Sequence, residues 1–165
     1  MNQPPTADLR IALISGGNSN EASVSRTSAA AVFSALSGHY SQVQNFELDG
    51  SLIKHLSDFQ PDVVFPVLHG PPGEDGTIQG LLEIMQLAYI GSGVQASALA
   101  MDKIAAKGLF REAKLPLVDH VTAHLCNGVN QTVDEVIASL GVNVVVKPAR
   151  QGSALGITLV NDAKG

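Results

Sequence analysis

Short apolar runs rich in β-branched residues alternate with helical stretches along most of this chain, and this alternation restricts the possible folds more than any other feature. The first three runs predict strands at Arg10–Ser15, Gln42–Leu48 and Val63–Leu68. Between them, apolar residues recur at helical spacing from about 21 to 36 and from 52 to 59. Strands that alternate with helices are typical of βαβ units on a parallel sheet. We therefore expect an α/β domain with right-handed crossovers and the strand order 2-1-3.

The same patterns predict further helices and strands. The sequence pattern changes after about Leu117. The expected helices are Thr77–Gln86, Gln95–Leu99, Lys103–Ala113 and Thr132–Leu140, and the expected strands are Tyr89-Ile90, Val118–Leu125, Val142–Lys147 and Ile157–Val160. Asp75 and Asp102 are candidate helix N-caps, and Thr132 with Glu135 has the form of a capping box.

The chain divides into three parts on this pattern. We expect a disordered N-terminus at residues 1–8, a first domain at 9–101 and a second domain at 102–165. The last part offers about three strands and one helix, and units below roughly 40–60 residues are only marginally stable alone. We therefore expect the rest of the second domain to lie outside this sequence. The alternatives are that the segment docks on the first domain or dimerises.

Composition and charge exclude several classes of protein. Charged residues make up 15% of the 165 residues and the net charge is −5, so there is no basic excess to neutralise the phosphates of a nucleic acid. No apolar run approaches the roughly 18 residues of a membrane span. The first eight residues lack the basic start and apolar core of a secretory signal. The single cysteine, Cys126, excludes an internal disulfide and fits a reducing cytoplasm.

Two glycine-containing loops follow the first and third predicted strands. The first glycine loop is residues 16–21 and the second is residues 69–76. Both are expected at the carboxyl ends of adjacent strands, where open α/β sheets bind ligands. Glu21 stabilises the following helix through its dipole, by about 0.3–1 kcal/mol, or pairs with a ligand ammonium group. His69 bonds a neighbouring carbonyl group or contacts a substrate. Neither loop has the dinucleotide or phosphate-loop fingerprint.

A third glycine loop, residues 147–156, has the composition of a phosphate cover. Its glycines let backbone N–H groups approach anionic oxygens. Lys147 closes a β-branched strand and either directs its ammonium group at such oxygens or extends its stem along apolar surface. No group of cysteines and histidines has metal-ligand spacing, and the sequence contains no nucleophile elbow.

Four segments together resemble one family closely in order and spacing. They are Gly16–Ala29, Leu68–Gly80, Tyr89–Lys103 and Val145–Pro148. From about residue 9 to its end, the chain resembles the D-alanine–D-alanine ligase family of the ATP-grasp superfamily. The resemblance implies a Rossmann-like, parallel-sheet N-terminal (pre-ATP-grasp) domain followed by the beginning of an ATP-grasp α+β domain.

The resemblance also implies roles for individual residues. Glu21 is the counterpart of the residue that orients the amino group of the first D-alanine, with Val24 and His69 in the same pocket. Ser153 is the counterpart of the loop serine that bonds to this glutamate and helps to close the site. The residues expected to contact ATP are Lys103, Lys147, Gly152, Ser153 and Gly156.

The implied reaction joins two D-alanines for peptidoglycan synthesis. ATP phosphorylates one D-alanine to D-alanyl phosphate, and the amine of the second attacks it. The family's magnesium ligands are expected beyond residue 165, so the resemblance implies no metal ligand within the chain. We therefore expect the 165-residue chain alone to be inactive. The resemblance further implies a cytoplasmic protein and a possible homodimer formed through the N-terminal domain, without nucleic-acid or membrane partners.

The chain departs from the family pattern at a few positions. Ala22-Ser23 replaces residues that are usually charged, Gln151 stands where glutamate is common, and Ala154 stands where a second serine is common. Loss of that hydroxyl group weakens phosphate contact by about 0.5–1.5 kcal/mol. Two other functions stay open: a D-alanine–D-lactate-type or other ATP-grasp ligase, and a non-catalytic binding or dimerisation fragment.

Overall fold

The computed structural model describes residues 8–124, 126 and 129–162. The chain forms two compact units, with the first ending at Ala98 and the second beginning at Leu99. The described residues include no helix that is both long and apolar enough to cross a membrane.

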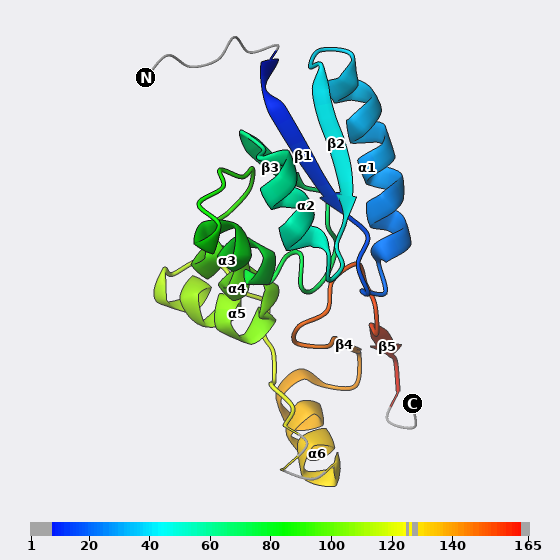
Figure 1. Cartoon of the computed structure of the whole chain (residues 1–165). Coiled ribbons are helices and arrows are strands. Elements are labelled where there is room, and N and C mark those ends of the chain that lie inside the picture. Colours follow the sequence, from blue (N-terminus) through cyan, green and yellow to red (C-terminus); the bar gives the residue numbers. More distant parts are fainter. Residues whose placement is uncertain (1–7, 125, 127–128, 163–165) are drawn as a thin grey trace. The chain divides into compact units, whose positions relative to one another are not determined.

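The first unit is an α/β domain built on a three-stranded parallel sheet (Figure 1). Its elements are β1 (Arg10–Ser15), α1 (Ala22–Ser37), β2 (Gln42–Glu47), α2 (Leu52–Phe59), β3 (Val63–Pro66), α3 (Thr77–Ile84) and α4 (Val94–Met101), whose last turn belongs to the second unit. The sheet order β2-β1-β3 confirms the predicted order. The predicted strand at Tyr89-Ile90 is reduced to an isolated parallel bridge between Tyr89 and Val64, in which Ile90 N donates to the Val64 carbonyl oxygen.

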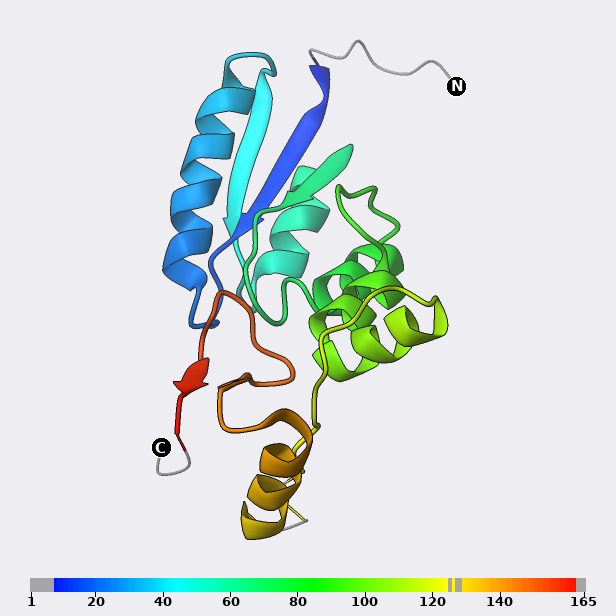
Figure 2. The same cartoon turned by 180° about the vertical axis from the view of Figure 1, so that it is seen from behind.

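Alternate residues of β1 bury their side chains on opposite faces of the sheet. Ala12 and Ile14 belong to a core with residues of α2 and α3, whereas Ile11 and Leu13 pack with Ala29 of α1. Figure 2 shows the layers from behind, with α1 on the face away from α2. Because a strand covered on both faces buries every side chain, β1 reads as the continuous apolar run seen in the sequence.

The helices of this unit differ from the predicted ones at several ends, with α3 ending at Ile84 and α4 spanning Val94–Met101, and at one predicted cap. Gly76, with φ of 93°, occupies the N-cap position of α3, where Asp75 was predicted. Asp75 lies one residue earlier, and its Oδ1 accepts a hydrogen bond from Thr77 N over 3.0 Å. A side chain at position 76 would lie 2.7 Å from the Val94 carbonyl oxygen, so the close approach of this loop requires glycine.

The second unit contains two helices and a short hairpin besides the end of α4. These elements are α5 (Lys103–Glu112), α6 (Val129–Leu140), β4 (Val144–Val146) and β5 (Thr158–Val160), with β4 and β5 antiparallel. Asp102 is the N-cap of α5, as predicted, because its Oδ1 accepts hydrogen bonds from Ile104 N and Ala105 N. None of the described residues of this unit is fully buried, which agrees with the thin layer expected from the sequence.

Two predictions for the second unit were wrong. The predicted strand at Val118–Leu125 forms no strand over its described residues, 118–124, because no neighbouring strand pairs with it and Val118 is 83% exposed. Leu125 lies outside the described residues. The predicted capping box was also wrong, because α6 begins at Val129 and Thr132 lies inside it.

Candidate functional site

The first and second glycine loops meet at the carboxyl ends of β1 and β3. Ser19 Oγ in the first loop donates a hydrogen bond to the His69 carbonyl oxygen over 2.9 Å. A Cβ added at Gly70 would lie 2.7 Å from Glu21 Oε2. The structure therefore brings Glu21 and the backbone after His69 together, as expected for the ends of adjacent parallel strands.

Glu21 is a buried carboxylate at the start of α1. Its exposed fraction is 6%, and its side chain makes no capping hydrogen bond although the residue occupies the N-cap position. Within the part of the chain that the structure describes, no cation lies within salt-bridge distance of it. A carboxylate on a residue that is almost wholly buried and has no cationic partner among the described residues is suited to receiving a small cation.

His69 and Val24 lie at different points along α1 relative to this carboxylate. The His69 ring is half-buried, and its Nε2 lies 3.4 Å from Ser28 Oγ on α1. Val24 lies three residues after Glu21, one helical turn further on, and is 54% exposed. The His69 ring therefore contacts α1 two turns after Glu21, and Val24 lies between the two positions.

Ser25 connects the start of the first glycine loop to the residue that follows β3, a role that the sequence analysis did not find. Its Oγ accepts a hydrogen bond from Gly16 N over 2.8 Å and donates one to the Val67 carbonyl oxygen over 2.5 Å. The side chain is fully buried. A serine on the buried face of an otherwise alanine-rich helix was the only sequence signal for this contact.

Glu47 holds the first glycine loop from the end of β2. Its Oε1 accepts a hydrogen bond from Gly17 N over 2.9 Å, and Arg26 of α1 pairs with the same carboxylate. The hydrogen bond from Arg26 lowers the pKa of Glu47 below its ordinary value. A Cβ at Gly16 would displace the Glu47 carboxylate from its place, and the positive φ of 77° favours glycine there.

The second unit brings the predicted ATP-contacting residues together. Lys103, Lys147, Gly152 and Ser153 line one cavity of about 170 Å³. Lys103 Nζ donates to the Gln151 carbonyl oxygen over 2.5 Å, and Lys103 N donates to the Ala149 carbonyl oxygen over 3.0 Å. The N-terminus of α5 is thus attached to the third glycine loop.

The third glycine loop curls tightly over this cavity. Ser153 and Ala154 are consecutive residues with positive φ, at 47° and 60°. Gly156 also has positive φ, and a Cβ there would lie 2.8 Å from Pro148 Cγ. Two ammonium groups under a curled, glycine-containing loop fit the oxygens of a polyphosphate. The predicted bond between Ser153 and Glu21 remains a prediction.

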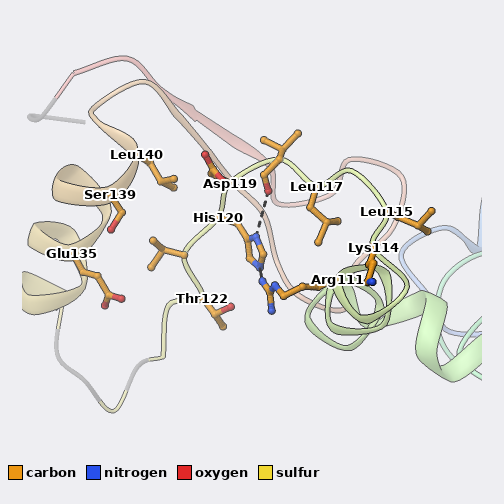
Figure 3. A pocket seen from close by; sticks show the side chains of 12 residues that line it. Arg111, Lys114, Leu115, Leu117, Asp119, His120, Thr122, Glu135, Ser139 and Leu140 are labelled. Atoms are coloured by element: carbon orange, nitrogen blue, oxygen red, sulfur yellow. Dashed lines mark hydrogen bonds between the residues drawn. The ribbon is translucent and has the colours of Figure 1, made fainter.

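A larger hollow of about 670 Å³ lies elsewhere in the second unit (Figure 3). Arg111 Nη2 lies 3.5 Å from His120 Nε2 on its wall, and His120 Nδ1 lies 3.4 Å from the Val118 carbonyl oxygen. The hollow is lined by none of the residues predicted to bind substrate or ATP.

An ion pair joins the start of α5 to the third glycine loop and makes the second unit sensitive to acid. Arg150 Nε donates to Asp102 Oδ2 over 2.8 Å. The hydrogen bond from Ala105 N, followed by that from Arg150, lowers the pKa of Asp102 below its ordinary value of 3.8. A carboxylate with a lowered pKa stabilises the folded state above the unfolded pKa, and this contribution is lost as the pH falls through the folded pKa.

We expect Asp102→Asn to reduce the melting temperature at pH 7 and to have a smaller effect as the pH falls below about 4. Asparagine retains the capping oxygen but removes the charge that pairs with Arg150, so the variant isolates the ionic part of the contact. Thermal unfolding followed by circular dichroism across this pH range measures it. An equal difference at every pH would contradict this interpretation.

The chain is similar to known proteins over most of its length. A family profile described as "D-ala D-ala ligase N-terminus" matches residues 44–92. The D-alanine–D-alanine ligase of Moorella thermoacetica is 41% identical over 93% of this chain and 51% of its own length. The chain thus spans about half the length of the curated relatives that it matches.

Solved structures show the same similarity. The D-alanine–D-alanine ligase of Bacillus anthracis superposes with a TM-score of 0.81 at 31% identity, covering 94% of this chain and 50% of that one, and it has also been solved in complex with ATP. The VanG D-Ala:D-Ser ligase of Enterococcus faecalis has a TM-score of 0.74 at 30% identity and covers 95% of this chain and 57% of its own.

Proposed function

This chain belongs to the D-alanine–D-alanine ligase family, and we propose that it supplies the first amino-acid site and part of the ATP site of an enzyme that joins two D-alanines. The observation that carries this proposal is the buried Glu21 carboxylate, which has no cationic partner among the described residues and lies against the second glycine loop. The ammonium group of D-alanine is a cation of suitable size. His69 and Val24 then complete the wall around the amino acid.

ATP supplies the phosphoryl group that activates a D-alanine carboxylate. In this proposal Lys103 and Lys147 hold its phosphate oxygens, while the third glycine loop covers them through Gly152, Ser153 and Gly156. Fixed positive charge is most effective where negative charge develops during phosphoryl transfer. Lys103 exchanges its bond to the Gln151 carbonyl oxygen for one to a phosphate.

Closure of the amino-acid site is assigned to Ser153 as the hydrogen-bond partner of Glu21. In the described part of the chain, no group of three or more histidine, cysteine, aspartate or glutamate side chains could hold a metal ion. No residue of this chain is therefore assigned to magnesium, and the steps proposed for its own side chains do not depend on the ion.

The wider role follows from the product. D-alanyl-D-alanine is a peptidoglycan precursor, so we place the reaction in the cytoplasm and in cell-wall synthesis. We also propose a homodimer formed through the N-terminal domain. A relative named as a D-Ala:D-Ser ligase favours keeping one second candidate function, a ligase that joins D-alanine to a different second substrate. Product analysis with D-alanine, D-serine and D-lactate separates the two candidates.

We expect D-alanine to bind to this chain more tightly than D-lactate by about tenfold or more. The two molecules have nearly the same shape, but D-lactate carries a neutral hydroxyl group where D-alanine carries the ammonium group that Glu21 would pair with. Isothermal titration calorimetry with both ligands, and with L-alanine as a stereochemical control, measures the difference. Equal affinity, or no binding of any of the three, would favour a non-catalytic module.

A further inference from the structure

Gln79 is a buried amide on the first turn of α3, and its hydrogen bond goes to the second glycine loop. The side chain is 8% exposed, and Nε2 donates to the Gly73 carbonyl oxygen over 3.0 Å. A carbonyl oxygen can only accept, so the amide nitrogen must face Gly73 and Oε1 must face away. The first turn of α3 is thereby tied to the middle of the loop that begins at His69.

The other end of the same amide has no partner. Of the buried side-chain nitrogen and oxygen atoms in the described part of the chain, Gln79 Oε1 is the one without a hydrogen bond. Buried polar groups are normally paired, and an unpaired one calls for an explanation. The neighbouring buried residues of α3, Ile78 and Leu82, are apolar. Within the described part of the chain, the hydrogen bond to Gly73 is therefore the one polar contact of the Gln79 amide.

Gly73 is hydrogen-bonded to Gly70, the residue that lies against Glu21. Gly73 N donates to the Gly70 carbonyl oxygen over 2.8 Å. Gly73 is confined on its other side, because a Cβ there would lie 2.3 Å from Leu68 Cβ. Gly70 in turn lies against the Glu21 carboxylate, with 2.7 Å between Oε2 and the position of a Cβ. The contacts form one series from Gln79 through the two glycines to Glu21.

We propose that Gln79 is a positioning residue for the first amino acid. By holding Gly73, it fixes the second glycine loop at the distance from Glu21 that leaves space for one ammonium group. It touches no substrate atom and acts only through Gly73 and Gly70. This inference rests on the proposed function for the identity of the ligand, but the action of Gln79 on the loop does not.

The test uses two variants whose side chains are about as long as that of glutamine. One removes the hydrogen-bond donor, and the other keeps a donor only when it is protonated. Gln79→Met removes the donor, and we expect it to weaken D-alanine binding by about fivefold to tenfold while nucleotide binding is unchanged. Gln79→Glu can donate to Gly73 only when its carboxyl group is protonated. Its D-alanine affinity relative to the parent chain should therefore be near one at about pH 5 and fall as the pH rises to about 8. A side chain that merely fills space gives no such pH dependence.

Gln95→Met is the matched control, because Gln95 is an exposed glutamine on α4 and should tolerate the same change without effect. Amide hydrogen exchange at Gly70 and Gly73 gives a readout that needs no ligand, and Gln79→Met should accelerate it. If the parent chain fails to bind D-alanine, the proposed function fails and exchange alone decides the role of Gln79. If Gln79→Met does not fold, the pH profile of Gln79→Glu decides it. Unchanged exchange, or a Gln79→Glu affinity ratio that is flat with pH, overturns the inference.

Discussion

Glu21→Gln should weaken D-alanine binding by about 10-fold to 100-fold, because hydrogen bonds to a charged group contribute about 1.5–3 kcal/mol and each 1.4 kcal/mol is tenfold in affinity. The substitution keeps the size and the hydrogen-bonding oxygen of the side chain, so it removes little except the charge. The lost charge is the one that is buried and without a cationic partner among the described residues. Calorimetric titration with D-alanine measures the effect.

Glu112→Gln is the control for this substitution. Glu112 is an exposed residue of α5, so the same loss of one negative charge there should leave D-alanine affinity unchanged. Nucleotide binding should be unchanged in both variants because the proposed phosphate contacts come from Lys103 and Lys147. Full D-alanine affinity in a folded Glu21→Gln chain would remove the physical basis for placing the ammonium group at this carboxylate.

The parts of the fold that could be predicted are those fixed by local pattern. The strand Arg10–Ser15 and the helix Leu52–Phe59 were predicted with the bounds that the structure shows. A continuous apolar run and a strong helical period are each visible within a few residues. The strand predicted at 118–125 failed because a β-branched run forms a strand only where another strand is available to pair with it.

The site could be predicted to a similar extent and for similar reasons. The first and second glycine loops could be placed next to each other because the carboxyl ends of adjacent parallel strands meet at one edge. The contacts of Ser25 could not be predicted, since they join residues 42 positions apart. The same holds for Glu47 and Gly17, which are 30 positions apart. Such contacts depend on side-chain positions that only the packed domain defines.

Ser25→Ala should lower the free energy of unfolding of the first unit by about 2–4 kcal/mol, because each buried polar group left without a partner costs about 1–3 kcal/mol. The substitution removes one hydroxyl group but leaves two buried backbone groups unpaired, Gly16 N–H and the Val67 carbonyl oxygen. With a urea dependence of about 2 kcal/mol/M, in the middle of the range for small domains, the midpoint of unfolding should shift by about 1–2 M.

Ser23→Ala, two residues earlier on the exposed side of α1, separates this effect from helix propensity. Alanine is the better helix former, so that variant should be unchanged or slightly more stable, within about 0.5 kcal/mol. If Ser25→Ala unfolds at the urea concentration of the parent chain, the hydroxyl group does not hold Gly16 to Val67. If it is destabilised as expected, one side chain holds the residue after β1 to the residue after β3, and the strand ends beside Glu21 depend on this hydroxyl group for their arrangement.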